Sequence, residues 1–200
     1  MIIRQLEVGQ MDNFCYLVGC EKTRKAAAID PGADVERILE EAQREKLAIA
    51  TIVNTHGHGD HTAGSAALKA LTGADILIHA LEAAAVPQAN ILISGDQDLM
   101  VGEITFKVFH TPGHTPGGIC LYAEGNLFTG DTLFVGDSGR TDLKGGHRPT
   151  LGVSIRRLMA LPDDTVVWPG HDYGPTPFST IGWEKRHNVN AKEYGYHVEG

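Results

Sequence analysis

The 200-residue chain lacks three kinds of segment, and each absence excludes a class of protein. No apolar run approaches the about 18 residues that a membrane-spanning helix needs. The N-terminal stretch, MIIRQLEVGQMDNFCYLVG, has neither the basic start nor the apolar segment of a secretory signal. Lysine and arginine form no long run, and 17 basic against 25 acidic side chains give a net charge of −8 at pH 7. These features predict a cytoplasmic protein that binds neither nucleic acid nor a membrane.

Cysteine is also scarce, with three residues in the chain. Cys15, Cys20 and Cys120 form no CxxC pair and lie in apolar, strand-like sequence. A cysteine in such surroundings usually packs as a small buried apolar side chain, and a reactive thiol is the alternative. The sequence therefore predicts neither a disulfide framework nor a cysteine metal site.

The composition is that of a globular protein, with 42% hydrophobic and 21% charged residues. A chain of this length suffices for one sizeable core. We expect a single domain over residues 1–200, in which residues 180–200 form a C-terminal extension with a final helix.

Short apolar runs rich in β-branched or aromatic residues predict strands. They cover residues 14–19, 25–30, 50–55, 74–79, 104–110, 118–123, 126–130 and 165–169. Helical periodicity predicts helices over 34–47, 62–71 and 150–161, the last with Thr150 as its N-cap. Many strands among few helices favour an α/β or α+β domain in which helices cover sheets.

The segment NTHGHGDHTAG, residues 54–64, places His56, His58, Asp60 and His61 within six positions. Residues two apart in an extended segment point the same way, so His56 and His58 can bind one cation together. A single histidine in a glycine-rich loop is usually a surface or capping residue. Four titratable groups this close together are explained better by a cation between them.

Three more candidate ligands follow later strands. His114 lies in HTPGHTPG, Asp131 ends NLFTGD, and His171 lies in PGHDYG. Loops beyond strand ends gather into sites, so these segments can converge on the first one. Seven nitrogen and oxygen ligands are too many for one tetrahedral zinc. They suit two ions about 3.5–4 Å apart with one bridging carboxylate.

These motifs resemble a known family. THGHGDH is similar to the THxHxDH signature of the metallo-β-lactamase superfamily, and HTPGHTPG, GDTLF and PGHDY resemble its later motifs in the same order. The resemblance implies a four-layer αββα sandwich with a dinuclear site at one edge. It implies that His56, His58 and His114 bind a first metal, that Asp60, His61 and His171 bind a second, and that Asp131 bridges them.

Within the superfamily, GDTLFVGDSGRTDL resembles the glyoxalase II (hydroxyacylglutathione hydrolase) group. That resemblance implies substrate contacts for Arg140 and Tyr173. Only 29 residues follow His171, which favours the short, single-domain glyoxalase II-like hydrolases and leaves glutathione specificity open.

The leading hypothesis is a metallohydrolase that cleaves a small-molecule thioester, of which a glutathione conjugate is one candidate. A metal-bound hydroxide at the dinuclear site would attack the substrate, and Asp60 would orient it and pass on its proton. Two divalent ions are expected, with zinc as the first choice and iron or manganese as alternatives.

Two alternatives remain open. GRTD and HDY also resemble the persulfide dioxygenases, which would use one iron held by His56, His114 and Asp131. A metal-binding protein without catalysis is the other.

The remaining candidates lie outside the motifs. Asp30 is the candidate for a carboxylate that orients a ligand histidine, with a turn-forming role before Pro31 as its alternative. His79 and His110 are expected to be structural. The three other histidines, namely His147, His187 and His197, are expected to be solvated.

Overall fold

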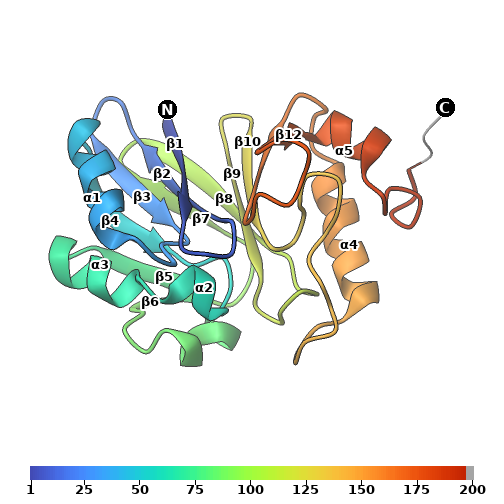
Figure 1. The fold of residues 1–200 in the computed structure, drawn as a ribbon, viewed down its shortest axis with the longest axis horizontal. Helices are drawn as coiled ribbons and strands as arrows, with labels where there is room; N and C mark the ends of the chain where they lie inside the picture. The colour runs from blue at the N-terminus through green and yellow to red at the C-terminus, as the bar shows by residue number, and fades with distance from the viewer. Residues whose placement is uncertain (197–200) are drawn as a thin grey trace.

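Two six-stranded β-sheets pack face to face in this computed structural model, which describes residues 1–196 (Figure 1). The first sheet contains, in pairing order, β1 (Ile2–Val8), β2 (Asn13–Gly19), β3 (Lys25–Ile29), β4 (Ala48–Val53), β5 (Asp75–His79) and β6 (Ile91–Ile93). The second contains β12 (Ser179–Thr180), β11 (Val166–Pro169), β10 (Asn126–Gly130), β9 (Ile119–Ala123), β8 (Ile104–His110) and β7 (Gln97–Val101).

Helices cover the outer faces of both sheets. The first sheet carries α1 (Val35–Arg44), α2 (Gly59–Thr62), α3 (Ser65–Thr72) and the 3₁₀ helix η1 (Ala80–Ala85). The second sheet carries α4 (Arg148–Met159) and α5 (Ile181–His187). Figure 1 shows α1 and α3 on the left and α4 on the right, with the sheets between them. The expected four-layer αββα sandwich is confirmed.

The core fills the spaces between these layers. The apolar cluster between the sheets includes Tyr16, Phe106 and Phe128. A second cluster joins the first sheet to α1 and α3, and a third joins the second sheet to α4. Strand β2 is buried along its whole length because alternate side chains face the opposite sheet and the helices.

Strand direction brings the candidate ligands together. Strands β3 to β6 run parallel, so their carboxyl ends share one edge of the first sheet. In the second sheet β8, β10 and β11 point the same way, because β9 is antiparallel to both β8 and β10 while β11 is parallel to β10. The loops that follow β4, β8, β10 and β11 all contribute residues to one group, described below.

The eight strands predicted from sequence are present, each within two residues of the predicted bounds at either end. The sequence did not predict the four edge strands β1, β6, β7 and β12, of which β6 and β12 are only three and two residues long. The helix expected over 62–71 is α3, which begins three residues later, at Ser65. The Gly64 N–H before it donates to the Pro31 carbonyl, and this contact separates α3 from the short helix α2.

The N-cap assignment to Thr150 is wrong. Helix α4 begins two residues earlier, and the N-cap is His147, whose Nδ1 accepts a hydrogen bond from the Thr150 N–H. An imidazole nitrogen thus serves where a hydroxyl was expected.

The C-terminal part of the described chain packs on the second sheet. Tyr194 is buried in the cluster that contains the apolar face of α4. His197 lies outside the described residues, as do the last positions of the predicted extension. No helix formed by residues 1–196 is long and apolar enough to cross a membrane.

Candidate metal centre

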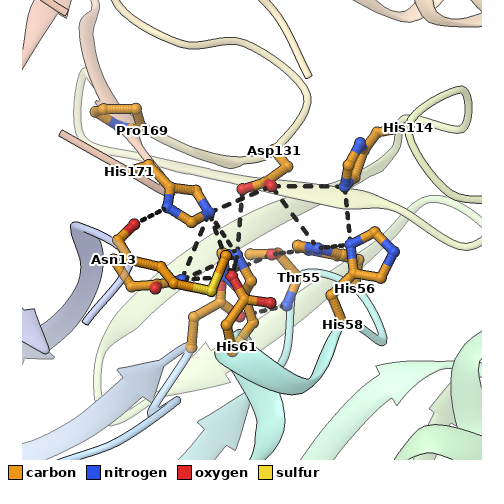
Figure 2. A network of polar contacts seen from close by, with 12 residues as sticks. Asn13, Thr55, His56, His58, His61, His114, Asp131, Pro169 and His171 are labelled. Atoms are coloured by element: carbon orange, nitrogen blue, oxygen red, sulfur yellow. Dashed lines mark hydrogen bonds and ion pairs between the residues drawn. The ribbon is translucent and has the colours of Figure 1, made fainter. Parts of the chain in front are cut away.

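Seven side chains that the sequence predicts as ligands meet at the shared edge of the sheets. Potential ligand atoms of His56, His58, His114 and Asp131 all lie within 4.8 Å of one another, as do those of Asp60, His61 and His171. Figure 2 shows His171, Asp131 and His114 facing His61, His56 and His58 across the group. We call His56, His58 and His114 the first histidine group, and Asp60, His61 and His171 the second group.

The segment after β4 is held by its own polar contacts. The Asn54 amide donates to the His61 carbonyl over 3.0 Å, and the Ser65 hydroxyl donates to Asn54 over 2.9 Å. His58 is the N-cap of α2, and Asp60 and His61 lie within that helix. A short loop followed at once by a helix therefore presents four ligand side chains in succession.

Hydrogen bonds fix which nitrogen of each ring faces inward. Nδ1 of His114 donates to the Arg140 carbonyl over 2.7 Å, and Nδ1 of His171 donates to the Met11 carbonyl over 2.8 Å. A carbonyl oxygen can only accept, so the proton is on Nδ1 in both rings. Their Nε2 atoms then carry the lone pairs that a metal requires.

The Asp30 carboxylate supports two more rings. It accepts a hydrogen bond from Nδ1 of His61 over 3.0 Å. It also accepts the hydroxyl proton of Thr55 over 2.6 Å, so this hydroxyl oxygen is left to accept from Nδ1 of His56, 3.1 Å away. Asp30 thus orients one histidine directly and another through Thr55.

The inward nitrogens lie close to one another. In the first histidine group, Nδ1 of His58 lies 3.0 Å from Nε2 of both His56 and His114. In the second group, Nε2 of His61 and His171 are 3.1 Å apart. Lone pairs at such distances repel unless a proton or a metal cation lies between them.

Asp131 lies between the two groups. Its Oδ1 is 3.3 Å from Nε2 of His61, and its Oδ2 is 3.5 Å from Nε2 of His114 and 3.4 Å from that of His171. Oδ1 is buried, and no hydrogen bond to it forms among the described residues. A carboxylate at this position can reach cations held by either group.

The electrostatics of the site favour a cation. Burial opposes the charged form of His61, but the carboxylates of Asp131, Asp30 and Asp60 raise its pKa to about 9. Burial would raise the pKa of Asp131, but His61 and His171 hold it well below its usual range. The three carboxylates around His61 therefore stabilise positive charge at this position.

In the first histidine group the pKa values of the rings are lowered, whereas that of His61 is raised. Burial lowers the pKa of His56 well below its ordinary value, and the positive charge of His61 lowers it further. Burial and the neighbouring His114 also lower the pKa of His58. Both rings are thus held neutral, which is the form that binds a metal. The residues fit two divalent cations with nitrogen and oxygen ligands.

A cavity of about 470 Å³ opens onto this centre. It is lined by apolar side chains, including Met11, Phe134 and Leu143, and by Arg140 and Tyr173. Tyr173 stacks on His171 with ring centroids 4.5 Å apart and is 54% exposed. The side chain of Arg140 is exposed and pairs with Asp142, from its Nε and Nη2 atoms, over 2.7 Å.

Sequence reasoning missed Asn13, the first residue of β2. Its amide nitrogen donates to the Asp60 carboxylate over 2.9 Å and lies 3.4 Å from Nε2 of both His61 and His171. An asparagine at the start of a strand carries no signal of such a role, since the contact joins residues far apart in the chain.

The histidines outside the centre have other contacts. His79 and His110 stack on each other, His147 caps α4, and His187 stacks on Trp183. None of the four belongs to a group that could hold a metal in the described part of the chain.

Comparison with known proteins gives consistent findings. The sequence profile of the Metallo-beta-lactamase superfamily matches residues 8–171. Hydroxyacylglutathione hydrolase of Rhodospirillum rubrum is 41% identical over 165 residues, which make up 81% of this chain and 63% of that protein. The chain thus spans less than two thirds of that relative.

Two crystal structures are similar over nearly the whole chain. ETHE1 from Myxococcus xanthus superposes with a TM-score of 0.90 at 37% identity, covering 98% of this chain and 89% of that one. TTHA1623 in a di-iron-bound form superposes with a TM-score of 0.80 at 31% identity, covering 93% of this chain and 98% of that one.

Proposed function

Because the chain belongs to the metallo-beta-lactamase superfamily, we propose that it is a metal-dependent hydrolase that cleaves a small-molecule thioester. The observation that carries the proposal is the position of Asp131 between two groups of converging ligand atoms. A carboxylate in this place can bridge two cations.

We assign the ligands as follows. The first histidine group would hold one ion, the second group would hold the other, and Asp131 would contribute its carboxylate to both. Zinc is the first choice, because nitrogen and oxygen ligands of this kind suit it. Iron and manganese are the alternatives, since a relative of the same fold is known in a di-iron-bound form.

When bound, two such cations would lower the pKa of a water molecule toward about 7 and polarise a substrate carbonyl. Asp60 has a carboxylate at the cavity wall, where it can orient the attacking water and accept its proton. In the reaction, the water oxygen bonds to the carbonyl carbon, the carbon–sulfur bond breaks, and the sulfur leaves as a thiolate. The products are a carboxylate and a thiol.

The cavity supplies substrate contacts of two kinds. Phe134, Leu143 and Tyr173 offer apolar surface, and Arg140 is the basic group in its lining. A substrate carboxylate can pair with Arg140 if it displaces Asp142, and an exposed pair of this kind is weak. The similarity to hydroxyacylglutathione hydrolase supports a glutathione conjugate as one candidate substrate.

A persulfide dioxygenase is the second candidate. It would need one iron and three ligands, for which His56, His114 and Asp131 have the required types and proximity. The GRTD and HDY motifs resemble that group as well as the hydrolases.

One experiment distinguishes the thioester hydrolase from the persulfide dioxygenase. The protein is purified without added metal and its metal content is measured by elemental analysis. It is then assayed for hydrolysis of a hydroxyacylglutathione thioester and for oxygen uptake with a persulfide. Two equivalents of zinc, manganese or iron with thioester cleavage support the hydrolase. One iron with oxygen uptake and no thioester cleavage would overturn it.

The cytoplasmic location stays a prediction.

A further inference from the structure

We propose that Glu82 is a positioning residue of the metal centre. Its carboxylate contacts both of the loops that carry the first histidine group and holds them at a fixed spacing. These loops are residues 54–58, after β4, and residues 111–118, after β8. Glu82 itself belongs to η1, which is not part of the motifs. The inference depends on metal binding at the first histidine group and not on which reaction the site performs.

The carboxylate of Glu82 contacts both loops. Its Oε1 accepts a hydrogen bond from the Gly117 N–H over 2.7 Å. Its Oε2 lies against Gly57, which stands between the ligands His56 and His58 (a Cβ placed there would lie 2.5 Å from Oε2). Since Gly117 is three residues from His114, one side chain spans the gap between the backbones that hold all three histidines.

The two glycines leave the room that this carboxylate occupies. A Cβ on Gly117 would lie 2.6 Å from Cγ of Glu82, and real contacts of this kind are essentially never so short. Neither glycine has a positive φ, so backbone conformation does not require glycine at either position. The Glu82 side chain provides the nearest atom at both positions, with Ala85 Cβ the next neighbour at Gly57 and His79 Nδ1 at Gly117, each at 3.0 Å.

Two stacked histidines also connect η1 to the loop after β8. His79 lies just before η1 and caps it, because its Nδ1 accepts a hydrogen bond from the Leu81 N–H. The His79 ring stacks on that of His110, with centroids 4.2 Å apart and an interplanar angle of 14°. His110 in turn donates from Nε2 to the Pro116 carbonyl over 2.9 Å. The segment before Gly117 is therefore held to η1 by a second route.

The expected effect is on metal affinity. A metal centre tolerates displacements of only about 0.5 Å in its ligands, so a change in the spacing of these loops weakens binding. Supporting residues of this kind typically change metal affinity by about 10–100-fold when they are replaced.

The test uses Co²⁺ as the probe. The apoprotein is titrated with Co²⁺ against a chromophoric chelator, and the visible absorption of the bound ion is recorded. Glu82→Ala and Glu82→Asp should each weaken one of two equivalents about tenfold and change its spectrum. Glu82→Gln keeps the length of the side chain and an oxygen that accepts from Gly117, so it should bind Co²⁺ within about twofold of wild type.

Two comparisons complete the design. Glu40→Ala changes an exposed carboxylate on α1 and should leave Co²⁺ binding unchanged. Gly57→Ala should weaken binding in the wild-type protein and have a smaller effect together with Glu82→Ala, because the carboxylate it meets is then gone. The unfolding temperature of each apoprotein shows whether the variant is folded.

The outcomes are distinguishable. Wild-type affinity and spectrum in both the Ala and Asp variants would overturn the role of Glu82 and leave the metal centre intact. A loss in Glu82→Gln as large as in Glu82→Ala would also overturn it, because the hydrogen bond would then not be the cause. A wild-type protein that binds no Co²⁺ would overturn the metal centre and this inference together.

Discussion

The carboxylate of Asp30 lies 3.0 Å from Nδ1 of His61 and orients that ring so that its Nε2 faces Asp131. Asp30 has a φ of 53°, a left-handed conformation that costs a residue other than glycine about 1–3 kcal/mol. The turn directs its carboxylate into the sheet edge, where Thr55 and His61 both donate to it. A strained turn and an oriented histidine are thus two consequences of one conformation.

Replacing Asp30 tests this relationship. Asp30→Ala removes the acceptor that orients His61, so the affinity of the second group for metal should fall about 10–100-fold. Isothermal titration of the apoprotein with Zn²⁺ measures the change, with Asp34→Ala on the adjoining exposed turn as the control. Unchanged binding of both equivalents would show that Asp30 only forms the turn.

Asp131→Asn removes the charge between the two groups and keeps the size of the side chain. We expect lower occupancy of the second ion and a loss of turnover of about 100-fold or more. Metal analysis and steady-state hydrolysis of the same preparation measure both effects. Retention of two ions with full activity would refute the bridging assignment.

Arg140 has two separable roles. Its backbone carbonyl supports His114, and its exposed side chain pairs with Asp142. Arg140→Gln keeps the carbonyl, so metal content should not change, whereas KM for a glutathione thioester should rise several-fold. A neutral thioester of the same acyl group is the control substrate and should be unaffected. A loss of metal in this variant would contradict the separation.

The three cysteines differ in acidity although all are buried and unpaired. Hydrogen bonds from Thr23 lower the pKa of Cys20 to about 7, and its side chain lines a cavity of about 220 Å³. Burial raises the pKa of Cys120 to about 11 and that of Cys15 further.

The thiolate is the nucleophile, so alkylation of native protein should occur at Cys20 and its rate should rise with pH to half its maximum near pH 7. Peptide mapping after iodoacetamide treatment from pH 5 to pH 9 measures this, and unfolded protein provides the control in which all three react. Modification of Cys15 before Cys20 would contradict the assignment.

Tyr16 connects the two sheets through its hydroxyl, which donates to the Pro169 carbonyl over 2.5 Å. Tyr16→Phe keeps the packing of the ring on Phe128 and leaves that carbonyl without the donor. The free energy of unfolding should fall by about 1–2 kcal/mol. Denaturant unfolding of the apoprotein measures it, and an increase in stability would show that the bond does not contribute.

The amino-acid sequence by itself determined which residues carry the chemistry. Four ligands lie within six positions of one loop, a density that needs no tertiary information to interpret. Apolar runs marked eight of the strands, including β2, which is buried along its whole length. They failed at β1, β6, β7 and β12, the four strands at the edges of the two sheets, because edge strands are stabilised by pairing more than by their own pattern.

The tertiary structure decided how those residues act on one another. The ring orientations depend on carbonyls of Met11 and Arg140, and a carbonyl is the same in every residue type. Asn13, from β2, contacts the ligand Asp60, and Glu82, from η1, contacts a ligand loop at Gly117; no motif marks either residue. Hydrogen bonds between segments far apart in the chain depend on the meeting of two sheets, and local sequence patterns report only neighbours.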